Sequence, residues 1–186
     1  MKKASILIGL IVVASVCAKA QPSNKSNVIL SKFHSYNTVQ LLNGSSSTSV
    51  AIASVNGFQF NHFFTGIGVG YDYYFRRTVP FFAEVRYDIG SNKRKLQLFA
   101  DFGANFLVDK NNGSQNNKTG RYWSTGFDYY IPIRKDAFTI GLGYSSKQVI
   151  YFGDNFLVLP VEGWQNVPIK YDYSLNRIAI RFGWVF

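Results

Sequence analysis

The chain has 186 residues, a length that suits a single domain. It carries 20 lysines and arginines against 10 acidic residues, a formal net charge of +10, but its longest basic run is only Lys93-Arg94-Lys95. Because the basic residues are scattered, we expect them in solvated turns and near anionic lipid head groups, and we expect no nucleic-acid partner.

The first twenty residues predict a signal peptide. A short basic start precedes an apolar stretch over residues 6–16, and Ala20 ends an A-x-A cleavage site. We therefore expect a signal peptide at 1–20, a mature N-terminus at Gln21 and one exported domain over 21–186. The chain's only cysteine raises the alternative of a lipoprotein, which the bulky valine before it disfavours. Cleavage after Ala20 removes this cysteine, so no disulfide is expected.

Eight runs of alternating apolar and polar residues follow along the chain. The first two cover residues 33–42 and 48–60 and are separated by Asn43-Gly44, a hairpin turn signal. Six clearer runs cover residues 63–75, 81–89, 96–106, 122–131, 138–145 and 177–186. In each of these six runs one face is almost free of charge, while the other collects glycines and ionisable groups. Because alternate side chains of a strand lie on opposite faces, the sequence predicts two-faced strands.

The last run shows this pattern most clearly. One face comprises Ile178, Ile180, Phe182, Trp184 and Phe186, and the other comprises Arg177, Ala179, Arg181 and Gly183. A single strand of this kind would suit a soluble sandwich. Its repetition, in runs of roughly the ten residues with which a tilted strand crosses a bilayer, favours the membrane. We expect an all-β fold, a transmembrane antiparallel up-and-down β-barrel of about eight strands, closed because an open edge would leave unpaired backbone groups in lipid.

The connections predict an orientation. With the N-terminus in the periplasm, the outward loops are residues 43–47, 76–79, 108–119 and 151–170, and the shorter inward turns lie near 61, at 91–95 and at 132–136. Long loops thus fall on the outside, as is usual for such barrels. The longest, 151–170, is unusually apolar. It could extend the last two strands, fold over the barrel mouth, or contact a surface partner.

Charged residues of both signs fall on the inward faces. They are Glu84, Arg86, Asp88, Asp101, Asp128, Lys147, Arg177 and Arg181. An eight-stranded barrel is just wide enough for side chains to fill it. We therefore expect these groups to pair around Phe82, Phe99, Tyr130 and Tyr173 as a structural plug, with Arg177 and Arg181 each meeting a carboxylate among Glu84, Asp101 and Asp128. A proton or ligand path through the lumen is the alternative.

Catalytic and cofactor motifs are not evident. His34 with Ser35 is the one pairing that could suggest a nucleophile and base, and His62 falls at an inward turn. Metal-ligand spacing is lacking, and the glycines at 66, 68 and 70 are expected on a strand face rather than in a phosphate loop. We expect no catalytic, metal or cofactor residues.

Several segments resemble a known family. The sequences NTVQLLNG (37–44), ASVNGF (53–58), TGIGVGYDYY (65–74) and YDYSLNRI (171–178) are similar to those of small outer-membrane β-barrel proteins with porin-like barrel domains. The resemblance implies the fold and an outer-membrane location more than an activity. Trp184 and Phe186 resemble the terminal aromatic signal that the barrel-assembly machinery reads, which implies that machinery as a partner during biogenesis.

Three classes of function fit these features. The first is a non-enzymatic envelope or surface protein that contacts outer-membrane lipid and lipopolysaccharide and uses the 151–170 segment for a surface partner. The second is a narrow passive pore, which would require a lumen poorer in bulky groups. The third is an enzyme that acylates or deacylates lipid A, which would require a His and a Ser at a lipid-accessible strand end.

Overall fold

The structure is a computed structural model, and it describes residues 32–45, 47–90, 94–108, 119–159 and 163–186. The expected signal peptide and the cleavage site between Ala20 and Gln21 lie outside the described residues. No helix in the described part of the chain is long and apolar enough to cross a membrane.

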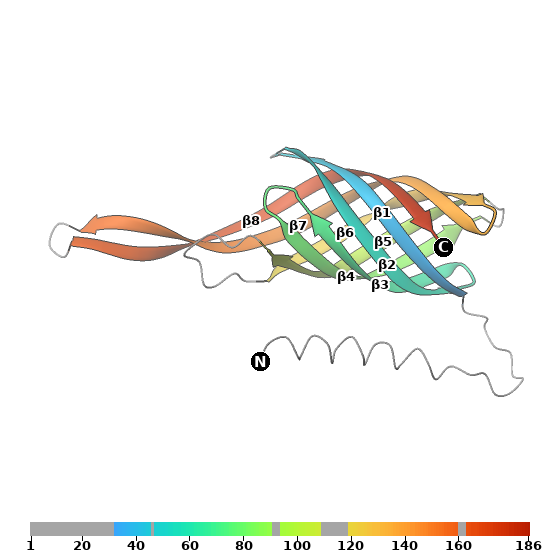
Figure 1. The fold of residues 1–186 in the computed structure, drawn as a ribbon, viewed down its shortest axis with the longest axis horizontal. Helices are drawn as coiled ribbons and strands as arrows, with labels where there is room; N and C mark the ends of the chain where they lie inside the picture. The colour runs from blue at the N-terminus through green and yellow to red at the C-terminus, as the bar shows by residue number, and fades with distance from the viewer. Residues whose placement is uncertain (1–31, 46, 91–93, 109–118, 160–162) are drawn as a thin grey trace, which may run out of the picture.

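Eight strands form one closed antiparallel barrel (Figure 1). They are β1 (Lys32–Gly44), β2 (Thr48–Phe60), β3 (Phe63–Asp72), β4 (Thr78–Ile89), β5 (Lys95–Leu107), β6 (Gly120–Ile133), β7 (Asp136–Leu159) and β8 (Gly163–Val185). Each strand pairs with its neighbour in sequence, and β8 pairs with β1, where Arg181 lies opposite Gln40. The predicted all-β, up-and-down, eight-stranded barrel is therefore confirmed.

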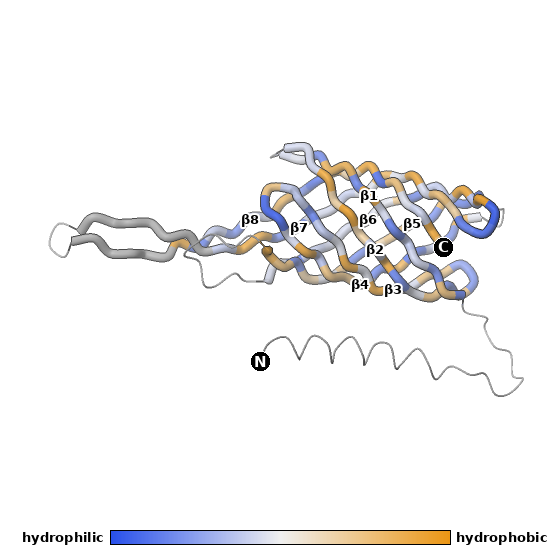
Figure 2. The backbone as a smooth tube through the Cα atoms, viewed as in Figure 1, coloured by the Kyte–Doolittle hydropathy of each residue, from blue (hydrophilic) through white to orange (hydrophobic). Residues whose placement is uncertain are grey.

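Apolar side chains cover the outside of the barrel. Phe102, Ile178 and Ile67 are the most exposed of them, at 71%, 61% and 60% of their surface. On β8, Ile178 and Ile180 are exposed whereas Arg177 and Arg181 are buried, so the two faces of the last strand lie as the alternation predicted. Figure 2 shows the same alternation of apolar and polar positions along the barrel strands. A large apolar outer wall of this kind requires an apolar surrounding.

The connections define two ends of the barrel. At one end, which we call the turn end, residues 61–62 and 134–135 join neighbouring strands as short turns. The opposite end is the ribbon end, because β7 and β8 continue there far beyond the other strands as a two-stranded ribbon (Figure 1). Their pairing runs from Tyr151 opposite Tyr171 to Leu159 opposite Gly163. Most of the expected 151–170 loop is thus strand and extends the last two strands, and its contact with a surface partner stays a prediction.

The turn between β1 and β2 lies later than Asn43-Gly44 predicted. Asn43 is still paired with Thr48, and its Nδ2 donates to the Thr48 Oγ1 at 2.9 Å. Gly44 continues β1 because it also pairs with Arg177 of β8. A Cβ at Gly44 would lie 2.6 Å from the Asn176 carbonyl oxygen and 2.5 Å from the Tyr74 hydroxyl. The glycine is therefore needed for close strand approach rather than for the turn itself.

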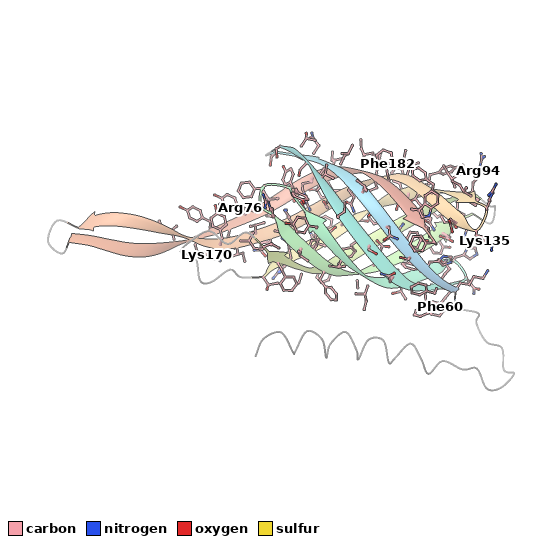
Figure 3. All side chains as sticks on the ribbon, in the orientation of Figure 1. Phe60, Arg76, Arg94, Lys135, Lys170 and Phe182 are labelled. Carbon is pink, nitrogen blue, oxygen red and sulfur yellow. The ribbon has the colours of Figure 1, made fainter. Side chains whose placement is uncertain are left out.

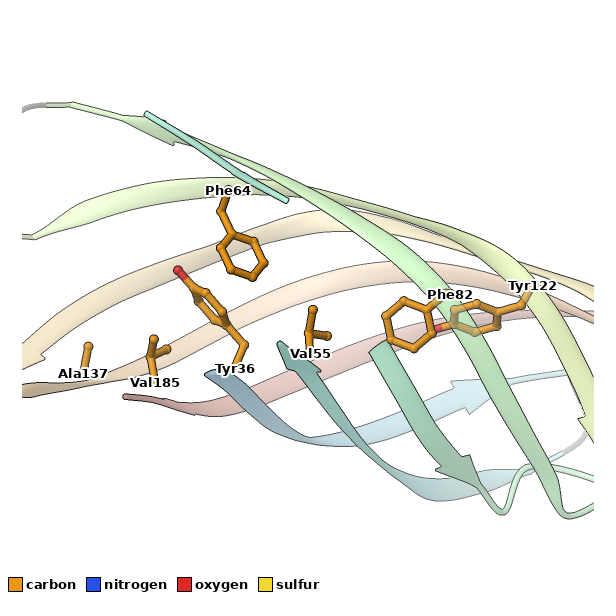
Figure 4. Packing of buried hydrophobic residues seen from close by; sticks show 7 residues of the cluster. All are labelled: Tyr36, Val55, Phe64, Phe82, Tyr122, Ala137 and Val185. Carbon is orange, nitrogen blue, oxygen red and sulfur yellow. The ribbon is translucent and has the colours of Figure 1, made fainter. Parts of the chain in front are cut away.

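Two apolar clusters lie inside the barrel. The first comprises Tyr36, Val55, Phe64, Phe82, Tyr122, Ala137 and Val185 (Figure 4). The second lies toward the ribbon end and comprises Leu42, Ala51, Tyr74, Val149, Leu175 and Ala179. In the first cluster the rings of Tyr36 and Phe64 are 4.8 Å apart, and those of Phe82 and Tyr122 are 5.3 Å apart. Aromatic side chains therefore occupy the interior together with the charged ones.

Candidate functional site

Nine charged side chains are buried within the described barrel, each 4% exposed or less. They are Asp72, Glu84, Arg86, Asp88, Asp101, Asp128, Lys147, Arg177 and Arg181. All eight that the alternation placed inward are among them, and the ninth is Asp72. With the half-buried Lys95, which pairs with Asp88, five carboxylates meet five cations. The interior is thus balanced in formal charge, and its charges are distributed over three groups along the barrel.

The central group is built around Arg86 of β4. Its Nε donates to Glu84 Oε1 at 2.5 Å, and its NH1 donates to Asp128 Oδ2 at 2.7 Å. The guanidinium also lies over the ring of Tyr36, 4.1 Å from its centroid. Charge-assisted hydrogen bonds of this kind are the strong ones in a protein interior. Arg86 therefore links β4 to β6 and to β1 across the lumen.

Arg181 of β8 completes the central group. Its guanidinium nitrogens lie 3.6 Å from Asp128 Oδ1, 3.8 Å from Glu84 Oε2 and 3.9 Å from Asp101 Oδ2. The structure thus brings Arg181 beside all three carboxylates expected for it. These distances are too long for hydrogen bonds, and Arg181 instead stacks on Phe99, 3.6 Å from the ring centroid. Three carboxylates share two guanidiniums here, an excess of one negative charge.

Arg177 has a different partner from those expected. It lies four residues before Arg181 and therefore about 13 Å further along β8, out of reach of the central carboxylates. Its NH1 donates to Asp72 Oδ2, and Lys147 Nζ lies 3.1 Å from the other oxygen of the same carboxylate. Lys147 also donates to the Thr78 hydroxyl at 3.2 Å. This second group, at the ribbon end, has an excess of one positive charge.

Asp72 was not among the residues predicted to line the lumen, although its position in the alternating pattern indicates an inward side chain. It stands on the polar face of the 63–75 run, in step with the inward glycines of β3. As the last residue of β3 it also accepts a hydrogen bond from the Tyr74 amide at 2.8 Å, which shapes the loop that follows. The Asp72 carboxylate thus binds both Arg177 and Lys147 and also fixes the start of the loop after β3.

The third group lies at the turn end. Asp88 accepts from Lys95 Nζ at 2.5 Å and from Gln97 Nε2 at 2.7 Å. Gln97 in turn lies 3.2 Å from the Tyr36 hydroxyl, which connects this group to the central one. Lys95, expected in a turn, is the first residue of β5 and reaches back toward the lumen.

The charged interior is not fully hydrogen-bonded by the described protein. Atoms without a partner there include Glu84 Oε2, Asp101 Oδ1, Asp128 Oδ1 and both Nε and NH1 of Arg181. Their ion pairs are therefore electrostatic rather than directional. A buried group of this kind contributes little net stability, but removing one member is costly.

The His34 and Ser35 pair does not form a catalytic arrangement. The two residues are adjacent on β1 and therefore point to opposite faces of the wall. Ser35 Oγ accepts from Asn37 Nδ2 at 3.2 Å, and the His34 ring lies near Tyr36, with centroids 6.5 Å apart. His62 is exposed in the turn after β2. Among the described residues, no group of three or more His, Cys, Asp or Glu side chains is arranged to hold a metal ion.

An aromatic group marks the base of the ribbon. Tyr151, Tyr171 and Tyr173 stack with interplanar angles of 1° to 18°, and Phe75 packs on Tyr173 at 5.2 Å. The Arg76 guanidinium lies over Tyr151, 4.9 Å from the ring centroid. Tyr173 was expected inside the lumen. It shares the inward face of β8 but stands above the barrel wall, where it is 38% exposed.

A carboxylate on the ribbon is also fixed by neighbours. Asp172 accepts from Gln148 Nε2 at 2.8 Å and from Lys170 Nζ at 3.2 Å. These hydrogen bonds hold the pKa of the Asp172 carboxyl below its usual range. The base of the ribbon is therefore tied together across β7 and β8 by both aromatic and polar contacts.

Comparison with known proteins supports the architecture. No family model matches the chain, and no curated protein matches its sequence. Among solved structures, Neisserial surface protein A from Neisseria matches with a TM-score of 0.53 at 12% identity, over 83% of this chain and 97% of that chain. A chain from work on the in-meso crystallization of membrane proteins matches at 13% identity, over 82% of this chain and 83% of that chain, with a TM-score of only 0.30. At 12% identity the likeness shows the fold alone, and it agrees with the closed eight-stranded β-barrel that the sequence motifs predicted.

Proposed function

We propose that the protein is an integral outer-membrane barrel with a plugged lumen, which anchors the β7–β8 ribbon above the membrane for a non-enzymatic contact at the cell surface. The filled interior beneath the projecting ribbon is the observation on which this proposal depends.

The outer wall supports the membrane placement. Its exposed side chains are mainly aliphatic and aromatic, while charges are held inside the barrel or at its two ends. Figure 3 shows Arg76 and Lys170 at the ribbon end and Arg94 and Lys135 at the turn end. Basic groups at these levels suit the phosphate-bearing head groups of lipopolysaccharide and phospholipid. Trp184 and Phe186, 41% and 59% exposed on the outer wall, suit the assembly signal predicted for them.

The interior supports a plug rather than a pore. The central charged group lies in the same lumen as the aromatic side chains of Tyr36, Phe82 and Tyr122. Large side chains on facing strands leave an eight-stranded barrel no continuous aqueous channel. Enzymatic action on lipid A gains no support either, because His34 and Ser35 lie on opposite faces of β1.

The ribbon supports a contact with another protein. Above the barrel wall β7 and β8 pair with each other, while pairing of β7 with β6 ends at Lys147 and pairing of β8 with β1 ends at Arg177. Each ribbon strand therefore has one free edge within the described residues. Such edges accept an added strand from a partner through main-chain hydrogen bonds.

Four measurements test this proposal. An epitope replacing residues 160–162 should be accessible to antibody on intact cells, and the purified protein should give no stable single-channel conductance and no change of lipid A mass in the same membranes. Deleting residues 155–164 should leave a heat-modifiable folded barrel. An epitope reached only after the outer membrane is permeabilised, or a stable conductance, would overturn the proposal.

A further inference from the structure

A polar patch interrupts the apolar outer wall on β1 and β2. It comprises Ser35 and Asn37 of β1 and Ser54 and Asn56 of β2, all at outward-facing positions of their strands. Asn37 is the cross-strand partner of Ser54, and Ser35 that of Asn56, so the four form one continuous block. Elsewhere on the described outer wall, between the aromatic residues near the two ends of the barrel, the polar groups are hydroxyls such as those of Thr65 and Thr125. The Thr125 hydroxyl donates to the Phe99 carbonyl oxygen.

The amides of this patch are incompletely satisfied. Asn37 Nδ2 donates to Ser35 Oγ, which uses one of the four hydrogen bonds that an amide can make. Asn56 is exposed, and the described residues give its side chain no hydrogen bond. In lipid an amide without a partner is costly, because hydrocarbon offers neither donors nor acceptors.

The wall beside the patch is hollowed. A groove of about 550 Å³ is lined by Asn37 and Ser54 of the patch, with Tyr71 and Trp184 at its sides. The convex surface of a barrel allows contact with a neighbour over only two or three strands. The short side chain of Ser54, between Tyr71 and Trp184, lets a second wall approach closely there.

From these observations we propose that the β1–β2 wall is the interface of a homodimer within the membrane, with the amides of Asn37 and Asn56 bonded to those of a second copy. This rests on the proposed membrane placement. Two copies inserted in the same direction are related by a twofold axis along the membrane normal, so each residue meets residues at its own depth. Asn56 then faces Asn56 of the partner subunit. An amide is its own complement, since it carries both a donor and an acceptor group, and a pair can exchange two hydrogen bonds.

Cysteine trapping in the full chain tests the interface. In a Cys17→Ser background, Asn56→Cys should give a disulfide-linked dimer in membranes under mild oxidation. Phe102→Cys, the most exposed position of β5 on a different part of the wall, should stay monomeric. Absence of the Asn56→Cys dimer, or equal trapping through Phe102→Cys, would overturn the proposal.

A second variant separates the role of the amides from mere proximity. Asn37→Leu with Asn56→Leu should weaken dimerisation in vesicles by about tenfold or more, measured by energy transfer between labelled copies, because the amide hydrogen bonds are lost. Its heat-modifiable band and outer-membrane fractionation should match those of the parent chain. Undiminished energy transfer, or groove-bound lipid that co-purifies with a monomer, would contradict the proposal. Loss of membrane fractionation in the parent chain would instead contradict the proposed function.

Discussion

Replacing Arg181 by methionine should destabilise the barrel strongly, although the side chain makes no hydrogen bond to the carboxylates around it. The guanidinium lies 3.6 to 3.9 Å from Asp128, Glu84 and Asp101. Without it, three buried carboxylates would face the single guanidinium of Arg86. Methionine preserves most of the apolar contact with Phe99, so the change in charge dominates.

The magnitude follows from the distances. At an effective dielectric constant of about 20, each pair of unit charges at about 3.8 Å attracts by about 4 kcal/mol. Much of that attraction offsets the desolvation of the arginine and the carboxylates, so the pairs do not add as net stability. Removing one member of a buried ionic group typically costs about 3–5 kcal/mol, because the other charges stay buried without compensation. We expect a loss of this size in the free energy of unfolding.

Urea unfolding in lipid vesicles measures this loss, with tryptophan fluorescence and gel mobility as the two signals. Phe182→Met is the matched control, because Phe182 is the next residue on the outer wall, and it should cost less than Arg181→Met. Adding Asp101→Asn to Arg181→Met removes one unbalanced charge and should recover part of the loss. Acidification should reduce the difference in free energy of unfolding between Arg181→Met and the parent chain, since protonation neutralises the surplus carboxylates. An unchanged urea midpoint for Arg181→Met, or a double variant no more stable than the single one, would refute the reasoning.

Three further predictions concern other parts of the barrel. Asp72→Asn leaves both Arg177 and Lys147 without their carboxylate, so we expect a loss of about 3–5 kcal/mol in the same urea assay, against a small effect for Asp136→Asn at the first residue of β7. Gly44→Ala places a Cβ against the Asn176 carbonyl oxygen and should cost about 1–3 kcal/mol, and an unchanged urea midpoint would contradict the close approach. The lowered pKa of Asp172 means that its contribution to the ribbon is present above the usual carboxyl range and is lost as the pH falls through the folded-state value. The protection factor of amides near Tyr171, which corrects the exchange rate for its intrinsic pH dependence, should therefore fall on acidification in the parent chain, and this fall should disappear in Asp172→Asn.

The sequence predicted which face each residue occupies better than it predicted which residues meet. Period-two alternation reports only the inward or outward direction of a side chain, and for residues such as Arg181 and Ile178 that direction is decided by a large difference in chemistry between lumen and lipid. The partner of Arg177 depends instead on its height along the barrel and on the register of strands distant in sequence. Neither is encoded in the alternation, so Arg177 was assigned to the central carboxylates although it pairs with Asp72.

Strand ends were predicted less well than strand faces for a related reason. Asn43-Gly44 is a strong local turn signal, yet pairing of Gly44 with Arg177 continues the strand past it. The 151–170 segment was likewise placed among the outward loops, with extension of the last two strands as one of three alternatives. There the pairing of β7 with β8 continues without support from a third strand, and the stacked tyrosines at its base are a tertiary feature that single-residue preferences cannot show.

Buried charges that add little net stability can still determine which barrel forms. A slip of β8 by one residue against its neighbours would turn Arg177 and Arg181 toward lipid and bring Ile178 and Ile180 into the charged interior. Arg181 exposed near the middle of the bilayer would cost about 2–4 kcal/mol, and Arg177, nearer the ribbon end, would cost less. Asp72 and Glu84 would each lose one of their two cationic partners at the same time. The β1–β8 seam closes the barrel and joins the most distant parts of the described chain, so an error in register is easiest there. The two arginines on β8 therefore disfavour closure of the barrel in a wrong register. This contribution to the register of β8 matters more than the energy of any one ion pair.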